Sequence, residues 1–244
     1  MKVSQLTLAY AQKNILENIN FFVKTHLCIL GANGSGKSTL AKALCGLIDY
    51  QGSLLLSDQE LRNINPVQRA KLITYIPAKM QSFEQFTTVE DFVLLGRYPY
   101  KNSFKDYTQE DKNIVNNVLR ELNIFELSHF KLHELSSGQQ QLILIAQALA
   151  QQSKILIFDE PTANLDPKNT LLFVKELTKL RKKHTVILIT HDIQLASHFK
   201  DPVLFLEDKK ATFYEKDFFQ LEILKNSYGV NFLNENNLLG ISYE

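Results

Sequence analysis

The sequence has little of what marks a disulfide-rich, membrane-spanning or nucleic-acid-binding protein. Its only two cysteines, Cys28 and Cys45, stand among apolar residues with no spaced partner, so we expect buried, reduced thiols and a cytoplasmic protein. The formal net charge is only +1, whereas nucleic-acid binders usually carry a strong positive field. One basic run, "KLRKKH" at 179–184, fits the C-terminal end of a helix, where cations meet the negative end of the dipole.

Long apolar runs are also missing. No stretch approaches the ~18 residues that a membrane span needs. The first residues, "MKVSQLTLAYAQ", lack the apolar core of a signal peptide. We therefore expect any work at a membrane to be that of a peripheral subunit.

What remains has the ordinary composition of a globular protein, with 45% hydrophobic and 22% charged residues in a chain of 244. Apolar spacing predicts antiparallel strands first, then a buried strand, a loop and a helix, then a helical region, and finally strands separated by a helix. A strand–helix–strand order implies a parallel sheet. The expected segments are strands at 3–23, 26–30, 53–57, 72–77, 154–160, 185–192 and 202–208, and helices at 38–47, within 89–150 and at 167–182.

These elements predict an α/β fold: a P-loop NTPase core with a parallel sheet, an N-terminal antiparallel β part and an inserted helical lobe. Residues 1–85 and 151–225 are expected to form the core. Residues 86–150 are expected to form the lobe, and 226–244 a C-terminal tail.

The segment "GANGSGKST" (31–39) fits the pattern G-x-x-x-x-G-K-[ST] between a predicted strand and a predicted helix. Gly34 and Gly36 let the backbone turn its N–H groups toward phosphate oxygens, and the helix N-terminus adds positive potential. Lys37 is expected to reach the β- and γ-phosphates, and the Ser38 hydroxyl to ligate Mg²⁺. Nucleotide binding follows, but kinases, GTPases, helicases and transport ATPases share this loop.

Polar residues follow two later strands of the predicted sheet. Asp159 and Glu160 end the run "KILIFDE", where Asp159 is expected to hold Mg²⁺ and Glu160 to activate water as a general base. His191 follows the apolar strand in "TVILITHD" at the sheet edge where ligands bind, so it is a candidate either for orienting that water or for a bond to the γ-phosphate. Asp166, before Pro167, fits an N-cap or a contact to a neighbouring subunit, and both interpretations stay open.

The run "LSSGQQQLILIAQALA" (135–150) predicts a helix capped by Ser136 or Ser137. Its apolar spacing predicts that Leu142, Ile145, Ala146 and Leu149 face a core. Capping alone does not explain why a glycine and three glutamines follow the serines.

Taken together, "GANGSGKST", "LSSGQ", "ILIFDE", "ANLD" and "THD" resemble the motifs of the ATP-binding cassette (ABC) family, in the family's order over nearly the whole chain. The resemblance implies an ATPase with ATP and Mg²⁺, in which the signature "LSSGQ" of one subunit covers the ATP on the phosphate loop of another. A second copy of the chain is therefore the expected partner. The implied residues are, for ATP, Tyr10 (adenine stacking), Gly31, Ala32, Asn33, Gly34, Ser35, Gly36, Lys37, Ser38 and Thr39; for ATP in trans, Ser136, Ser137, Gly138, Gln139 and Asp166; for the metal, Ser38 and Asp159; for catalysis, Glu160 and His191.

Within that family, "TVEDFVLLGRYPY" (88–100) and "SYGVNF" (227–232) resemble ATPase subunits of bacterial importers for iron–siderophore, haem or cobalamin. Such a subunit is expected on the cytoplasmic face of the cell membrane, with permease subunits and, indirectly, a substrate-binding protein as partners, and no nucleic acid. The alternative is a soluble ABC ATPase, such as those of iron–sulfur cluster assembly. A DNA-repair ABC protein needs a longer coiled-coil insertion, and "LSSGQ" argues against a nucleotide kinase.

One position departs from the family. "YIPAKMQSF" (75–83) has Ala78 where a glutamine that touches Mg²⁺ and the attacking water is usual. Lys79 and Gln81 are the candidates to replace it, and the sequence does not choose between them.

Overall fold

The computed structural model describes residues 1–244 except 12, 81–85, 103–104, 236–237 and 243–244. Its contacts divide the chain into two compact units. The first unit comprises Met1–Asn63 and Ile187–Glu244, and the second unit comprises Ile64–Val186. The sequence-based division into core, lobe and tail stays a prediction beside this one.

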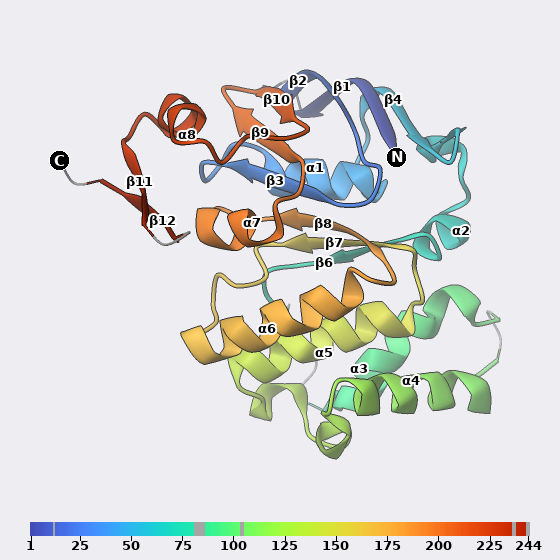
Figure 1. The fold of residues 1–244 in the computed structure, drawn as a ribbon. Helices are drawn as coiled ribbons and strands as arrows, with labels where there is room; N and C mark the ends of the chain where they lie inside the picture. Colours follow the sequence, from blue (N-terminus) through green and yellow to red (C-terminus); the bar gives the residue numbers. More distant parts are fainter. Residues whose placement is uncertain (12, 81–85, 103–104, 236–237, 243–244) are drawn as a thin grey trace. The chain divides into compact units, whose positions relative to one another are not determined.

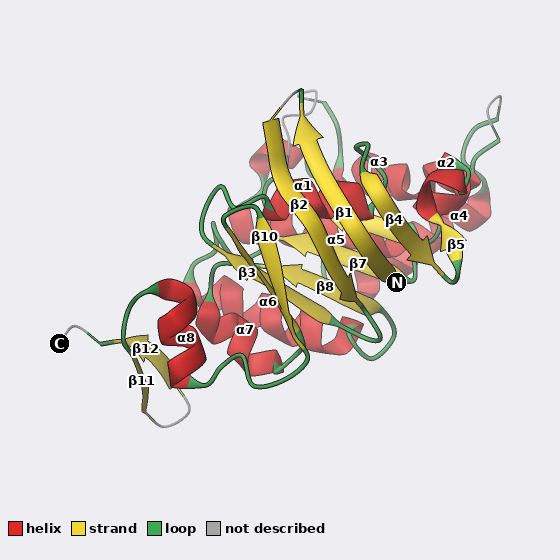
Figure 2. Ribbon diagram, turned by 90° about the horizontal axis from the view of Figure 1, so that it is seen from above, coloured by secondary structure: helices red, strands yellow, loops and turns green. Residues whose placement is uncertain are grey.

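An antiparallel sheet in the order β2-β1-β4-β5 opens the first unit (Figure 2). The apolar residues Val3 and Leu6 of β1 are both buried although they lie three positions apart. A register shift between them, with φ of +52° at Gln5, absorbs the extra residue and returns Leu6 to the core face. The strands are β1 (Lys2–Tyr10), β2 (Lys13–Phe22), β4 (Gln51–Leu56) and β5 (Gln59–Glu60), followed by the short helix η1 (Leu61–Asn63).

The second sheet of this unit is parallel around β3 (Leu27–Gly31), all five of whose residues are buried. β3 pairs in parallel with β8 (Thr185–Ile189), a strand that runs across the division between the units, and with β9 (Val203–Glu207). β9 pairs antiparallel with β10 (Lys210–Tyr214). Helices α1 (Lys37–Leu44), α7 (Ile193–Phe199) and α8 (Leu221–Tyr228) and the hairpin β11 (Phe232–Glu235) and β12 (Leu238–Ile241) complete the unit.

The second unit joins a parallel strand pair to the helical segment. β6 (Ile73–Ile76) and β7 (Ile155–Asp159) pair in parallel, and α3 and α4 both pack on α5 (Figure 1). The sequence-based expectation of strands, helices and parallel pairing is therefore confirmed in both units. The helices are α2 (Pro66–Ala70), α3 (Val89–Leu94), η2 (Leu95–Tyr100), α4 (Gln109–Glu121), η3 (Phe125–Leu127), η4 (Leu132–Glu134), α5 (Ser137–Ala150) and α6 (Pro167–Leu180).

A buried ion pair fixes η2 inside the helical segment. Arg97 Nε lies 2.9 Å from Asp111 Oδ1, and each residue is only 5% exposed. Arg97 also donates to the carbonyl of Ala150, the last residue of α5, at 2.8 Å. A Cβ at Gly96 would collide with the carbonyl oxygen of Gln147 on the same helix. The segment "LLGRYPY" therefore has a structural task, which is to anchor η2 to α4 and to the end of α5.

Both cysteines are buried and no disulfide joins them, as expected. Over the residues that the structure describes, no helix has the length and apolarity that crossing a membrane requires. The longest, α5 and α6, have 14 residues each.

Candidate active site

The phosphate loop leaves β3 and ends at α1, which begins at Lys37, one residue before the predicted start. Gly31, Gly34 and Gly36 have φ of +151°, +82° and +98°, a backbone region that side chains other than glycine rarely adopt. Gly36 is the N-cap and supplies no side chain to the first N–H groups of the helix. Those donors are therefore available to an anion at the helix N-terminus.

Lys37 is the charged centre of this loop. Its side chain is folded back, and Nζ donates to the carbonyl oxygens of Gly31 at 2.8 Å and Ala32 at 3.0 Å. Lys37 is only 6% exposed, which is rare for a lysine and needs such partners. The buried hydroxyl of Ser35 has no hydrogen-bond partner among the described residues. The loop thus holds a buried cation beside uncapped backbone donors, as a phosphate site requires.

Tyr10 and His191 belong to the same unit. Ile29 of β3 pairs with Ile189 of β8, so Gly31 and His191 each lie two residues beyond a paired position of neighbouring parallel strands. His191 thus follows the end of β8 on the side of the sheet where the phosphate loop begins, and it is exposed. Tyr10 ends β1 and is 49% exposed. The contact of either residue with ATP stays a prediction.

Asp159 ends β7 in the second unit, and its carboxylate is bound on one side only. Oδ2 accepts the Tyr75 hydroxyl hydrogen at 2.7 Å, whereas Oδ1 is buried without a partner among the described residues. Asp159 is 4% exposed, so this oxygen is costly to leave unpaired. A buried carboxylate oxygen without a donor suits a divalent cation, and the residue therefore fits the predicted Mg²⁺ ligand.

Glu160 follows with φ of +50°, a left-handed conformation that is strained for a glutamate. The chain thus turns at the end of β7. This turn breaks the strand alternation, so Glu160 is not forced to the face opposite Asp159.

The loop after Pro77 lies against the start of α5. A cavity of about 280 Å³ is lined by Ala78, Lys79 and Met80 of this loop, and Lys79 is exposed there. Gln81 lies outside the described residues. The choice between Lys79 and Gln81 as the replacement for the usual glutamine stays a prediction. The other residues of the wall are Ser137, Gln140, Gln141 and Leu144 of α5, and Pro161, Asn164 and Leu165 after β7.

Ser136 is the N-cap of α5. Its Oγ accepts from the Gln139 N–H at 3.3 Å, and Gln139 Oε1 accepts from the Ser136 N–H at 2.9 Å. Gln140 Nε2 donates to the carbonyls of Leu132 at 3.4 Å and Leu135 at 3.3 Å. The expectation that capping leaves the glutamines unexplained is therefore wrong for Gln139, which closes the capping box, whereas Gln140 binds the preceding turn.

The rest of the signature segment divides between solvent and core. Ser136 and Ser137 are exposed and Gly138 is buried, so the serine hydroxyls are accessible to another molecule. On the predicted core face, Ile145 and Ala146 are buried, while Leu142 and Leu149 are half-buried. The helix is instead buried around much of its circumference, which a single apolar stripe did not predict.

Asp166 caps α6, with Pro167 at the first helical position, which confirms that interpretation. Its second role, facing another subunit, stays a prediction. Sequence reasoning missed Asn169, which contacts both the signature segment and the cap of α6. Its side chain lies between Gly138 and Asp166.

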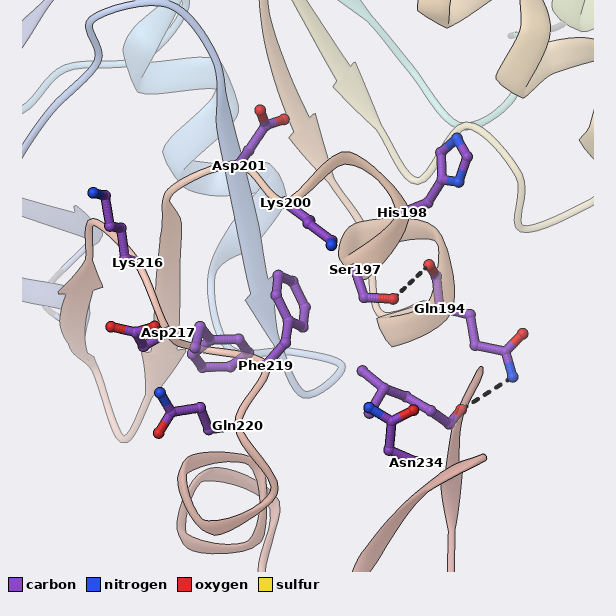
Figure 3. Close-up of a pocket in the computed structure, with 12 residues that line it drawn as sticks. Gln194, Ser197, His198, Lys200, Asp201, Lys216, Asp217, Phe219, Gln220 and Asn234 are labelled. Carbon is purple, nitrogen blue, oxygen red and sulfur yellow. Dashed lines mark hydrogen bonds between the residues drawn. The ribbon is translucent and has the colours of Figure 1, made fainter. Parts of the chain in front are cut away.

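A further cavity, of about 730 Å³, lies in the first unit between α7, the loop before α8 and the β11–β12 hairpin (Figure 3). Gln194 donates to the carbonyl of Leu239 across it at 3.1 Å. Its wall contains none of the residues expected to bind ATP. It is therefore separate from the site that the motifs define.

Comparison with known proteins gives consistent results. The ABC transporter family profile matches residues 16–163. The chain is 32% identical to the petrobactin import ATP-binding protein FpuD of Bacillus anthracis, over 86% of this chain and 78% of that one. It is 34% identical to the manganese transport ATP-binding protein MntB of Halalkalibacterium halodurans (84% and 82% covered) and to an iron chelatin transport ATP-binding protein of Helicobacter pylori (86% and 84% covered).

Solved structures show the same fold. A chain of a transporter described as of the metal-chelate type, in an inward-facing conformation, superposes with a TM-score of 0.83 at 27% identity, covering 98% of this chain and 94% of that one. A bacterial ABC transporter cassette solved as a dimer superposes with a TM-score of 0.75 at 26% identity, covering 88% and 97%.

Proposed function

Since this chain belongs to the ABC transporter ATP-binding family, we propose that it is the ATP-hydrolysing subunit of a membrane importer for a metal chelate, such as an iron–siderophore, haem or cobalamin complex. Membership of this family supports ATP binding and hydrolysis. The importer and its cargo are supported by relatives whose names specify petrobactin, iron chelatin and manganese. The structural observation that carries the proposal is that one chain presents both an open phosphate loop and an exposed, capped signature helix.

The phosphate loop receives the nucleotide. In the proposed mechanism the γ-phosphate draws Lys37 Nζ away from the carbonyls of Gly31 and Ala32, because a phosphate oxygen is a stronger acceptor for an ammonium. The N–H groups that begin α1 donate to the same phosphates. Residues 31–39 thereby position the phosphates, and Tyr10 stacks on the adenine.

Ser38 and Asp159 are the residues that would hold Mg²⁺. The fit rests on Asp159, whose Oδ1 is buried without a partner while Tyr75 holds the other oxygen. When bound, the ion supplies positive charge to the phosphate oxygens.

Glu160 is proposed to accept the proton of the attacking water, and His191 to orient that water. Glu160 suits this task because its left-handed backbone turns it out of the strand alternation. The strain of that conformation is the kind that is retained at functional sites.

A second copy of the chain completes each site in this proposal. Ser136 and the N-terminus of α5 would form an anion site for the second copy, since the Ser136 hydroxyl is exposed while it caps the Gln139 N–H. Ser137, Gly138, Gln139 and Asp166 accompany it toward the γ-phosphate of the partner's ATP. Two-fold symmetry then gives two nucleotides per dimer.

The permease is proposed to dock on the helical segment. Phe86 is 75% exposed and Phe130 is 48% exposed, and Lys131 Nζ lies 5.4 Å from the Phe86 ring centroid. The Val89 N–H donates to the Phe130 carbonyl, which ties the segment that follows Phe86 to the segment of Phe130. Exposed aromatic side chains of this kind mark interaction surfaces. The subunit would then sit on the cytoplasmic face of the membrane, and a substrate-binding protein would deliver cargo to the permease.

Reconstitution tests the proposal. The chain is coexpressed with its permease, placed in proteoliposomes and assayed for ATP hydrolysis with binding protein loaded with ferric siderophore, haem or cobalamin, or with Mn²⁺. We expect one chelate to stimulate hydrolysis and to enter the vesicles, and the Lys37→Ala complex to do neither. If the chain stays soluble beside every permease and hydrolyses ATP at an unchanged rate, the soluble ATPase is the correct alternative.

A further inference from the structure

Asn169, in the first turn of α6, touches the signature helix. A Cβ placed on Gly138 would lie 2.5 Å from Asn169 Cγ, 2.6 Å from Oδ1 and 2.7 Å from Nδ2. These distances are below any normal contact, so the backbone of Gly138 is packed directly on the face of the Asn169 amide. The contact joins the first turns of α5 and α6, which carry the two residues.

Two hydrogen bonds tie Asn169 to Asp166, the N-cap of the same helix. Its Nδ2 donates to Asp166 Oδ2 at 2.8 Å, and its backbone N–H donates to Asp166 Oδ1 at 2.8 Å. Asn169 therefore engages both oxygens of the N-cap carboxylate. Hydrogen bonds to a charged acceptor are the stronger kind, so this amide has a fixed orientation.

Gly138, Asn169 and Asp166 thus form one packed chain of contacts. It joins the start of α5 to the start of α6, and both of these starts carry residues that the proposed function assigns to the partner's ATP. Without the Asn169 amide, Asp166 loses the hydrogen bond from Nδ2, and Gly138 loses the group on which its backbone packs.

We propose that Asn169 is a positioning residue for the ATP-bound dimer: it holds Asp166 and the signature segment as one rigid unit, so that both reach the nucleotide of the second copy together. The inference rests on the proposed function, because it assumes the ATP sandwich. Asn169 itself need not touch ATP. The contact with Asn169 also accounts for the glycine at position 138, since a Cβ there would displace the amide.

The test measures ATP-induced dimerisation in a Glu160→Gln parent, where slow hydrolysis keeps ATP bound. Asn169→Ala removes the amide, and Asn169→Asp replaces the donor with a carboxylate that repels Asp166. We expect the dissociation constant of the ATP-bound dimer to rise about 10- to 100-fold in both variants. When the same substitutions are made in the protein that retains Glu160, kcat for ATP hydrolysis should fall. The affinity of the monomer for ATP should stay within about twofold of the parent, because the phosphate loop is unchanged.

Lys168→Ala is the matched control, since Lys168 is an exposed neighbour on the same helical turn and should leave dimerisation unaltered. A merely structural role for Asn169 would instead lower the melting temperature and weaken ATP binding and dimerisation together. That result, or dimerisation at the parent's level, would overturn the inference.

A second pair of variants addresses the contact itself. Gly138→Ala should weaken dimerisation by displacing the Asn169 amide, and adding Asn169→Ala to it should cost less than Asn169→Ala costs in the parent, because the amide is already displaced. Strictly additive losses would mean that the two residues are not coupled. A parent that stays monomeric with ATP would contradict the sandwich of the proposed function, and the inference with it, whereas a dimeric parent with unaffected Asn169 variants rejects the inference alone.

Discussion

The hydroxyl of Tyr75 lies 2.7 Å from Oδ2 of Asp159, and this bond joins the ends of the parallel strands β6 and β7. It occupies one carboxylate oxygen and leaves the other, Oδ1, buried without a partner among the described residues. The carboxylate is therefore held in one orientation before any cation binds. Sequence reasoning identified Asp159 but not the residue that orients it.

Tyr75→Phe tests this orientation. Losing the bond leaves a second carboxylate oxygen unpaired, so we expect about 1–3 kcal/mol of destabilisation, smaller when Mg²⁺ and ATP are present. Thermal unfolding in chelator and in Mg²⁺–ATP measures the difference. Tyr98→Phe is the control, because Tyr98 is 70% exposed. An equal loss for Tyr75→Phe in both conditions would separate Tyr75 from the metal site.

Lys37→Ala should abolish ATP hydrolysis. The side chain is the buried cation of the phosphate loop, and its removal also frees the carbonyls of Gly31 and Ala32. Steady-state ATP hydrolysis is the measurement, and Lys42→Ala, on the same helix, should remain close to wild type. Near-normal activity of Lys37→Ala would reject the phosphate-loop assignment.

Tyr10→Ala should weaken ATP binding by ~1–3 kcal/mol if the ring stacks on adenine. The residue is 49% exposed at the end of β1, so truncation should leave the fold intact. Titration with ATP and with inorganic triphosphate separates the base from the phosphates. Loss of affinity for both ligands alike, or for neither, would make Tyr10 an ordinary strand residue.

Arg97→Ala should cost about 3–5 kcal/mol of unfolding free energy at neutral pH, because it strands the buried carboxylate of Asp111. Burial favours the neutral acid, but the hydrogen bonds from Arg97 and Thr108 outweigh it and lower the pKa of Asp111. A lowered folded-state pKa gives stability that is present above the unfolded value of about 3.9 and is lost as pH falls through the folded value.

Urea unfolding at pH 7 and below pH 4 therefore checks the Arg97 prediction. The difference between wild type and Arg97→Ala should shrink at acid pH, while the exposed Lys112→Ala on α4 shows little effect at either. A difference independent of pH would mean that packing of Arg97, rather than its charge, stabilises the helical segment.

Much of the fold was predictable because its signals are local. "HLCIL" is a continuous apolar run and forms most of the wholly buried β3, and Ser136, one of the two predicted caps, is the N-cap of α5. The phosphate loop, Asp159 and His191 follow strands whose parallel pairing brings their ends to a common edge within each unit. Their positions directly after apolar runs were therefore enough to predict them from the sequence.

The parts that sequence reasoning missed depend on contacts between distant residues. Nothing near Asn169 indicates that it meets Gly138, and nothing near Tyr75 indicates that it binds Asp159. The bulge at Gln5 and the tail elements α8, β11 and β12 likewise have no strong periodicity, since tertiary packing rather than propensity decides them.

The most direct test of the whole account is the mass of Glu160→Gln in solution, measured by light scattering after size-exclusion chromatography with and without Mg²⁺–ATP. With hydrolysis slowed by about 10²–10⁴-fold, the account predicts a monomer without nucleotide and a species of twice the 28.0 kDa chain mass with ATP. A protein that binds ATP yet keeps the mass of a single chain would contradict the claim that two copies complete each other's active sites.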